Sequence, residues 1–324
     1  MTHAIRMHKT GGPEVLSWEE VSLGKPGPGE VRLRHTAIGL NYIDTYHRSG
    51  LYPLPLPTTI GSEGAGVVEE VGPSVSGLKV GDRVAYGGGP LGSYCEARNV
   101  AADRLVPIPQ GVSDQQAAAM MLKGMTAQYL IRRTYRVKAG DTILIHAAAG
   151  GVGLIVCQWA KHLGATVIGT VGSEEKAQLA KRYGCDHPIV YTREDFVARV
   201  AEITGGKKVP VVYDSVGKDT FMKSLDCLAP LGLLASFGQS SGAIGPVDLG
   251  ILAPKGSLYV TRPTLGTYTA KREDLLATAQ DLFDVVAKGI VKIEINQTYP
   301  LKEAAQAHRD LQARKTTGST VFTV

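Results

Sequence analysis

Between about residue 124 and residue 240, short apolar runs alternate with amphipathic stretches. The runs are TILIHA, ATVIGTV, HPIVY, VPVVYDSV and LGLLASFG. Continuous apolar runs are typical of parallel strands buried on both faces, and the stretches between them have the period of helices. The pattern predicts four helices, over residues 152–163, 174–183, 194–203 and 219–228. This half of the chain is therefore expected to form an α/β, doubly wound parallel sheet.

The pattern is different on either side of this alternation. Up to about residue 120 the chain has strand-like runs such as VRLRHTAIGL, GAGVVEEVG and GDRVAYG, separated by Gly and Pro, which favour a compact β-rich domain with few helices. SLYVTRP favours a final strand of the parallel sheet. A helix over 272–288 and the strand-like ending TGSTVFTV then depart from the rhythm. We therefore expect domains over residues 1–123 and 124–265, and a C-terminal segment, 266–324, that returns to the first domain.

Composition narrows the class of protein. Of 324 residues 44% are hydrophobic and 20% charged, and the net charge is +5. No apolar stretch approaches the roughly 18 to 20 residues that cross a bilayer, and MTHAIRMHK lacks the apolar region of a secretory signal. The basic residues are dispersed, and the four cysteines show no disulfide spacing. We expect a cytoplasmic protein with reduced cysteines, no membrane association and no obligatory nucleic-acid partner.

The stretch HAAAGGVG lies between the first apolar run and the helix that follows it. A glycine-rich turn at this place lets backbone N–H groups and the helix N-terminus face a pyrophosphate. Gly150, Gly151 and Gly153 meet that demand, while Ala147 replaces the usual first glycine and requires a slightly different turn. The strand before, the helix after and the continued alternation favour a nucleotide site over an ordinary tight turn.

The end of the next apolar run reads GTVGSEEK. A cofactor without a 2′-phosphate is usually selected by an Asp or Glu here. This chain instead has uncharged Gly172 and Ser173, followed by Lys176 in the first helical turn. A phosphate would be a partner for that lysine, which favours NADPH over NADH. The alternative is that Lys176 is a solvated residue paired with a neighbouring glutamate.

The chain lacks the usual means of stabilising an alkoxide. The first domain holds only Cys95, the histidines have no metal spacing, and no Tyr-x-x-x-Lys relay occurs. Hydride transfer without strong electrophilic help suits quinones and activated enones, whose reduced forms are stabilised anions. These residues predict a site without metal.

Several segments together resemble one family. HKTGGPEVL, AIGLNYIDTYHRSGLYP, LKGMTAQYL, HAAAGGVG, GTVGSEEK, VVYDSVG, SFGQSSG and GSLYVTRP are similar to the bacterial NADPH:quinone oxidoreductases, relatives of zeta-crystallin in the zinc-independent medium-chain dehydrogenase/reductase superfamily. The resemblance implies a GroES-like β-rich domain, a Rossmann domain and a cofactor cleft between them. Zinc-dependent members carry a metal-binding Cys and His where this chain has Asn41 and Ser62.

The resemblance also implies the cofactor-binding residues. The nicotinamide end would be lined by Asn41, Tyr42, Ile43 and Asp44, with Thr126 and Tyr129 nearby. The pyrophosphate would be held by Gly150, Gly151, Val152 and Gly153. The adenosine phosphate would be surrounded by Gly172, Ser173, Lys176, Tyr191 and Arg314. The cleft would be completed by Val216, Gly238, Gln239, Ser240, Ser241 and Arg262.

For the substrate we expect a pocket shaped by Asn41, Tyr46 and Tyr52, in which these side chains donate hydrogen bonds to the substrate oxygen. For Asn41 the alternative is a residue that only forms a turn. For the tyrosines the alternative is a place in the core or on the surface. No residue stands out as an obligatory acid, so no catalytic base is named.

The resulting hypothesis is NADPH-dependent reduction of benzoquinone- or naphthoquinone-type quinones by direct electron or hydride transfer, without metal or flavin. A homodimer is expected, with SLYV extending the sheet across the dimer. Two alternatives remain open: an NADPH-dependent enone or enal reductase, which would differ only in its pocket, and a non-enzymatic, NADPH-responsive RNA-binding protein.

Overall fold

A computed structural model describes residues 1–324 as two compact units. The first unit comprises Met1–Met125, Tyr268–Ala287 and Ile293–Val324. The second comprises Thr126–Thr267 and Lys288–Lys292.

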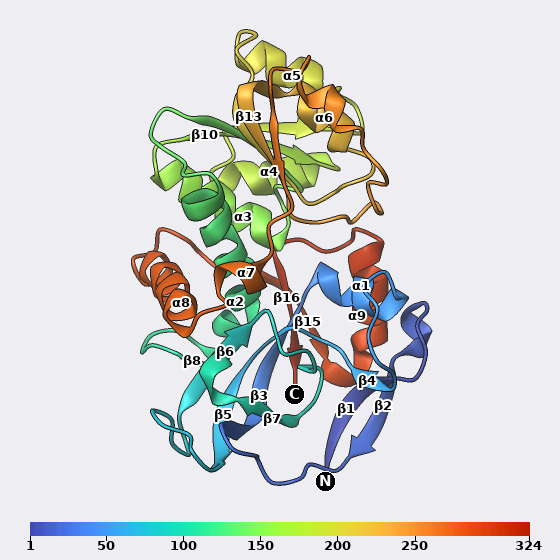
Figure 1. Cartoon of the computed structure of the whole chain (residues 1–324), viewed down its shortest axis with the longest axis vertical. Coiled ribbons are helices and arrows are strands. Elements are labelled where there is room, and N and C mark those ends of the chain that lie inside the picture. Colours follow the sequence, from blue (N-terminus) through green and yellow to red (C-terminus); the bar gives the residue numbers. More distant parts are fainter. The chain divides into compact units, whose positions relative to one another are not determined.

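The first unit is built on two sheets (Figure 1). A seven-stranded sheet runs in the order β15 (Ile295–Pro300), β16 (Ser319–Thr323), β3 (Glu30–Leu40), β5 (Glu63–Val71), β6 (Arg83–Gly87) and β8 (Val106–Pro107), with β7 (Ala97–Ala101) also paired to β3. A three-stranded sheet has the order β2 (Ser17–Val21), β1 (Thr2–Met7) and β4 (Thr58–Thr59). Because β16 pairs with β3, most of the C-terminal segment belongs to this unit.

The core of this sheet follows the alternation of its strands. Val31 and Leu33 of β3 are buried, and they pack with Val68 of β5 and with Val84 and Tyr86 of β6. The helices of the unit are α1 (Tyr42–Ser49), most of α2 (Asp114–Tyr129), α8 (Arg272–Ala287) and α9 (Ala304–Gln312). Such a sheet places strand ends and the loops that follow them at two opposite rims.

The second unit holds a six-stranded parallel sheet. Its order is β11 (His187–Val190), β10 (Thr166–Val171), β9 (Thr142–His146), β12 (Val209–Asp214), β13 (Leu228–Ser236) and β14 (Tyr259–Thr261). The strand order reverses next to β9, which is the Rossmann arrangement, and ligands of such sheets bind outside the carboxyl ends of the strands at that point. The α/β prediction is confirmed.

The four predicted helices of this unit are present as α3 (Gly151–His162), α4 (Glu174–Arg182), α5 (Phe196–Ile203) and α6 (Phe221–Asp226). The expected last strand is β14, at the edge of the sheet. Shorter elements are η1 (Pro13–Val15), η2 (Ala102–Arg104), the π-helical turn η3 (Leu130–Thr134), η4 (Leu249–Leu252), α7 (Leu265–Tyr268) and η5 (Leu301–Glu303).

Four helices were not predicted from the sequence: α1, α2, α7 and α9. In α2 the residues Ala117–Met121 are all buried, so this part of the helix has no polar face and no helical period to read. None of the helices is both long enough and apolar enough to cross a membrane.

Candidate active site

The glycine-rich turn connects β9 to the first turn of α3. Ala147 takes the left-handed conformation, with φ +56°, where the usual motif has glycine. Gly150 is the N-cap of α3 and provides no side-chain cap, so the first N–H groups of the helix are not capped by it. A Cβ on Gly153 would lie 2.3 Å from the Ala147 carbonyl oxygen. Glycine there lets the helix approach the turn closely.

A second set of predicted residues lies at the carboxyl ends of β10 and β11, which pair in parallel. A Cβ on Gly172 would lie 2.9 Å from the Tyr191 hydroxyl oxygen, so this hydroxyl lies directly over the glycine. Ser173 is the N-cap of α4, and its side chain accepts from the Lys176 backbone N–H at 3.4 Å. The structure thus brings Gly172, Ser173, Lys176 and Tyr191 together.

The glutamate next to Ser173 has cationic and amide partners. Arg193 donates to the Glu174 carboxylate at 2.6 Å, and Gln178 donates to it at 3.0 Å. This ion pair reduces the repulsion that a phosphate near Lys176 would meet. The sequence analysis did not consider Arg193, which follows β11 rather than β10.

The third set lies where β12, β13 and β14 end. Both the backbone N–H and the hydroxyl of Ser241 donate to the Val216 carbonyl at 2.8 Å. Arg262 donates to the carbonyl oxygens of Ser236 and Gly238, each at 2.8 Å. Two further contacts belong to this cluster. The Ser240 N–H donates to the Ser215 carbonyl at 3.1 Å, and Gln239 lies against Gly217.

A buried polar network links these strand ends, and sequence reasoning missed it. Ser224 donates to Asp214 at 2.9 Å and therefore accepts from His146 Nε2, also 2.9 Å away, while His146 Nδ1 lies 2.8 Å from the Thr170 hydroxyl. Burial lowers the pKa of His146, although Asp214 opposes this. Asp214 also accepts from the backbone N–H of Val216 at 2.8 Å. The polar residues near the ends of the apolar runs were the feature of the sequence from which this network could have been predicted.

In the first unit, Asn41 is the N-cap of α1, directly after β3. Asp44, three residues on, accepts from the Asn41 backbone N–H at 2.9 Å and from the Tyr94 hydroxyl at 2.8 Å, and Ser62 donates to its other oxygen at 3.3 Å. Asp44 is fully buried, and burial raises its pKa to about 7 against the effect of these hydrogen bonds. Its carboxylate therefore holds the start of α1 in place.

This network continues through Tyr94 to α9. Tyr94 lies 3.0 Å from His308 Nε2, and Arg48 donates to His308 Nδ1 at 3.0 Å. Because an arginine only donates, Nε2 carries the proton of the neutral ring and donates to Tyr94, which in turn donates to Asp44. Burial, assisted by the charge of Arg48, lowers the pKa of His308 to about 3.

A buried ion pair lies beside Asn41. Glu63, at the start of β5, is fully buried, and one carboxylate oxygen accepts from Asn41 Nδ2 and from Lys123 Nζ, both at 2.8 Å. The other oxygen accepts from the Leu122 backbone N–H at 2.7 Å. Sequence reasoning named Asn41 and missed both charged partners. The single lysine inside the apolar stretch AAAMMLKGM was the feature of the sequence from which a buried ion pair could have been predicted.

Three tyrosines lie in α1 and in the loop that follows it. The Tyr42 and Tyr46 ring centroids are 5.6 Å apart, and those of Tyr46 and Tyr52 are 5.2 Å apart, both in edge-to-face arrangements. Tyr46 is buried and Tyr52 half-buried. Burial raises the pKa of Tyr42, and the charges of Arg314 and Arg48 oppose this, which puts Arg314 in the electrostatic neighbourhood of Tyr42.

Comparison with known families matches both halves of the chain. Residues 27–140 match the alcohol dehydrogenase GroES-like domain, and residues 151–281 match the zinc-binding dehydrogenase family. A quinone oxidoreductase of Pseudomonas aeruginosa is 59% identical over 323 residues, which cover 99% of each chain. The chain belongs to the quinone oxidoreductases of the medium-chain dehydrogenase/reductase superfamily. The resemblance and the GroES-like and Rossmann fold classes are thereby confirmed.

Two further relatives of this quinone oxidoreductase are informative. The solved structure of Escherichia coli quinone oxidoreductase complexed with NADPH is 52% identical, has a TM-score of 0.98 and covers 99% of this chain and 100% of its own. A 2-haloacrylate reductase from a Burkholderia species is 51% identical over 333 residues, covering 99% of each chain. The prediction that the chain is an enzyme is confirmed.

Asn41 and Ser62 stand where the family resemblance implies the zinc ligands of zinc-dependent relatives, and they carry an amide and a hydroxyl group. Asn41 donates to Glu63, and Ser62 donates to Asp44. No group of three or more His, Cys, Asp or Glu side chains is placed to hold a metal ion. The residues at these positions are instead hydrogen-bonded parts of the protein.

The predicted site residues are divided between the two units. The first unit holds Asn41, Tyr42, Ile43, Asp44, Tyr46, Tyr52 and Arg314, and the second holds all others, including Thr126 and the buried Tyr129 at the end of α2. That the two sets meet around one cofactor stays a prediction.

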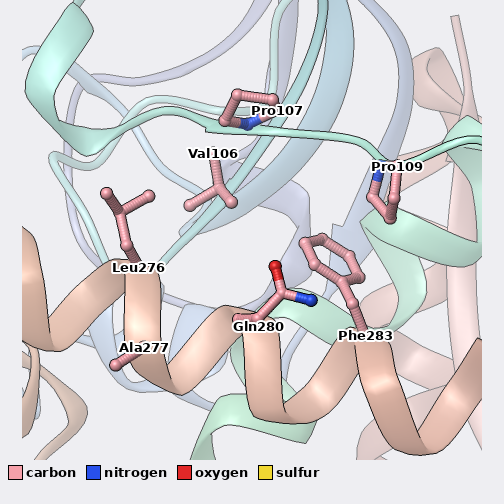
Figure 2. Close-up of a pocket in the computed structure, with 7 residues that line it drawn as sticks. All are labelled: Val106, Pro107, Pro109, Leu276, Ala277, Gln280 and Phe283. Atoms are coloured by element: carbon pink, nitrogen blue, oxygen red, sulfur yellow. The ribbon is translucent and has the colours of Figure 1, made fainter.

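A cavity of about 440 Å³ lies elsewhere in the first unit, between β8 and α8 (Figure 2). Its lining is Val106, Pro107, Pro109, Leu276, Ala277, Gln280 and Phe283. The only polar side chain among these, Gln280, already donates to Asp284 at 2.7 Å. None of the predicted site residues lines this cavity, and its apolar walls are unsuited to a phosphorylated cofactor.

Proposed function

We propose that this enzyme reduces quinones of the benzoquinone or naphthoquinone type with NADPH, by direct transfer from the nicotinamide and without metal or flavin. The observation that carries the proposal is the likeness to quinone oxidoreductases over the whole chain, at 59% identity to the Pseudomonas protein. The residues at the end of β10 add independent support, because they include no acidic group in the place that selects a free ribose hydroxyl.

The second unit fits a phosphorylated dinucleotide. The N-terminus of α3 has no side-chain cap, so its N–H groups are available to a pyrophosphate. Gly172 lies beneath the Tyr191 hydroxyl, and Lys176 is in the next helical turn. In this proposal Ser173, Lys176, Tyr191 and Arg314 bind the 2′-phosphate. NADPH itself supplies the reducing equivalents.

The substrate side of the proposal rests on α1. Tyr46 and Tyr52 lie edge to face and offer aromatic surface to a flat quinone ring. Because quinones need little electrophilic help, positioning the ring against the nicotinamide would supply most of the rate, and effective-molarity effects reach about 7–11 kcal/mol.

The test is NADPH oxidation followed by absorbance with purified, EDTA-treated protein. NADPH and NADH are compared with benzoquinone, a naphthoquinone, an enone and a simple aldehyde as acceptors. We expect rapid, quinone-dependent oxidation with NADPH and slow oxidation with NADH. Absence of quinone reduction in the presence of bound NADPH would contradict the proposal.

The second candidate function is reduction of a double bond activated by a carbonyl or carboxylate group. It is favoured by the 51% identity to a 2-haloacrylate reductase. Such an enzyme would share the cofactor residues and differ in its pocket. In the same assay it would reduce the enone or 2-chloroacrylate faster than either quinone.

We also propose a homodimer formed through the edge of the parallel sheet. The edge strand β14 pairs only with β13, and its Tyr259 and Val260 are 60% and 38% exposed. An apolar edge strand of this kind favours pairing with a second copy. Analytical ultracentrifugation should give a dimer for the wild type and a monomer for Tyr259→Asp, because pairing of the two edges would bury the new carboxylates. A monomeric wild type would contradict this proposal.

A further inference from the structure

The buried Glu63–Lys123 pair lies beside Asn41 at one rim of the seven-stranded sheet. Asn41 follows the end of β3, Glu63 starts β5, and Lys123 reaches them from α2. The Glu63 side chain is fully buried and that of Lys123 is 9% exposed. A buried ion pair of this kind contributes little net stability, so stability alone does not account for its presence at this rim.

At this rim the Asn41 amide has two acceptors within the protein. Its Nδ2 donates to Glu63 at 2.8 Å and to the Gly39 carbonyl at 3.4 Å, which uses both of its N–H groups. A Cβ on Gly39 would lie 2.2 Å from the Glu63 carboxylate, so glycine is needed for Glu63 to occupy this place. Both N–H groups of the Asn41 amide thus have acceptors within the protein, and donation by Asn41 to a substrate oxygen stays a prediction.

Lys123 does have donors to offer. An ammonium carries three N–H groups, and Lys123 donates one of them to Glu63. Two N–H groups thus remain for a molecule that binds beside Asn41. Glu63 fixes the position of both side chains because the same oxygen accepts from each.

We propose that Lys123 donates a hydrogen bond to the substrate oxygen and stabilises the anion that develops there, while Glu63 positions Lys123. This inference rests on the proposed function. A hydride from NADPH brings two electrons and one proton to the quinone, giving NADP⁺ and a hydroquinone monoanion. Lys123 keeps its proton throughout, and water supplies the second proton of the hydroquinone. The ammonium does for this oxygen what an oxyanion hole does in acyl transfer.

The test compares Lys123→Met with the double variant Lys123→Met/Glu63→Gln. Removal of one donor to a developing oxyanion lowers kcat by about 10²- to 10³-fold. The single variant leaves Glu63 as an unpaired buried charge and is expected to be less stable. The double variant removes both charges and keeps one acceptor oxygen for Asn41 while giving up the hydrogen bond from Leu122 N–H, so it is expected to be more stable than the single variant. We expect kcat to stay low in both variants, with NADPH affinity within about threefold of wild type.

A series of quinones of decreasing reduction potential separates donation from a structural role. Poorer acceptors need more stabilisation of the developing anion, so the loss in kcat should grow along the series. A folding defect would lower every rate by one common factor. Lys161→Met, which removes a cation paired with Asp186 in the second unit, is the control and should keep wild-type rates.

Recovery of the wild-type kcat by the double variant would overturn the inference, because it would show that Lys123 only neutralises Glu63. A loss that is constant along the quinone series would also overturn it. The wild-type rate by itself decides the proposed function. The ratio of variant to wild type, measured with whichever acceptor the wild type reduces, decides the role of Lys123.

Discussion

At the scale of single residues, the site is defined by which partners each polar side chain has already taken. The Asn41 amide donates to Glu63 and to Gly39. Lys123 donates one of its three N–H groups to Glu63. At the other site, Glu174 is paired with Arg193, and Lys176 and Tyr191 are the groups that we propose for the phosphate. Residue identity alone does not distinguish a committed donor from an available one.

The first prediction concerns Lys176. A charge-assisted hydrogen bond contributes about 1.5–3 kcal/mol, so Lys176→Ala should weaken NADPH binding roughly 10- to 150-fold. NADH lacks the phosphate, and its affinity should change little. Titration of protein fluorescence with each cofactor measures both constants.

Lys181→Ala is the matched control, since Lys181 is an exposed lysine in the last turn of the same helix. It should leave both affinities unchanged. Equal losses for NADPH and NADH in the Lys176 variant would argue against a phosphate contact.

At the scale of elements, the carboxyl ends of the parallel strands are held by one buried network. His146 at the end of β9, Thr170 in β10 and Asp214 at the end of β12 are connected through hydrogen bonds, with Ser224 of α6 between His146 and Asp214. Buried polar groups that are fully hydrogen-bonded give an element a unique position. The turns expected to touch the cofactor are therefore anchored from beneath.

The second prediction concerns the contact between the phosphate turn and α3. In Gly153→Ala the new Cβ would lie 2.3 Å from the Ala147 carbonyl oxygen, so helix and turn must separate. Overpacking of this kind costs about 1–3 kcal/mol. We expect a lower melting temperature and weaker NADPH binding, measured by thermal denaturation with and without cofactor.

The comparison variant is Gly24→Ala, because a Cβ at Gly24 would meet nothing within 4 Å. Its melting temperature should match the wild type. Wild-type NADPH affinity in Gly153→Ala would show that the close approach is not needed for binding.

At the scale of the whole molecule, buried titratable groups make stability depend on pH. Burial lowers the pKa values of His35 and His308 to about 3, below the usual 6.5 of an unfolded chain. As the pH falls below 6.5, these two histidines bind protons in the unfolded chain but stay neutral in the folded chain, so the free energy of unfolding falls. Asp44 acts in the opposite direction, because its raised pKa lets the folded chain bind a proton between about pH 7 and 4.

The third prediction isolates one of these groups. Gln in place of His308 can accept from Arg48 and donate to Tyr94, so His308→Gln should retain the network without the titration. Relative to wild type, the variant should lose less stability on acidification, by about 1.4 kcal/mol per pH unit below 6.5, or about 2 kcal/mol at pH 5. Calorimetric or urea unfolding at pH 7.5 and pH 5 gives the comparison. Parallel pH profiles of the two proteins would exclude His308 as a source of acid sensitivity.

The linear pattern of the chain was sufficient for the second unit. Its apolar runs and helical periods predicted β9 to β13 and α3 to α6 in order, because each strand is buried on both faces and each helix on one, and both leave a local signal. The phosphate turn was equally readable, since glycine is required there by backbone approach alone. The family likeness, also a property of the sequence, identified the kind of enzyme.

Only the tertiary structure decided which polar groups meet. Glu63 and Lys123 are sixty residues apart, and Asp44, Tyr94 and His308 come from three distant segments. Each looks like an ordinary residue in its own stretch of sequence, because the hydrogen bonds that give it a role are made by residues that only folding brings near. Burial is decided in the same way, since it depends on the packing of whole elements. It turns Lys123 from one lysine among many into a positioned cation beside Asn41.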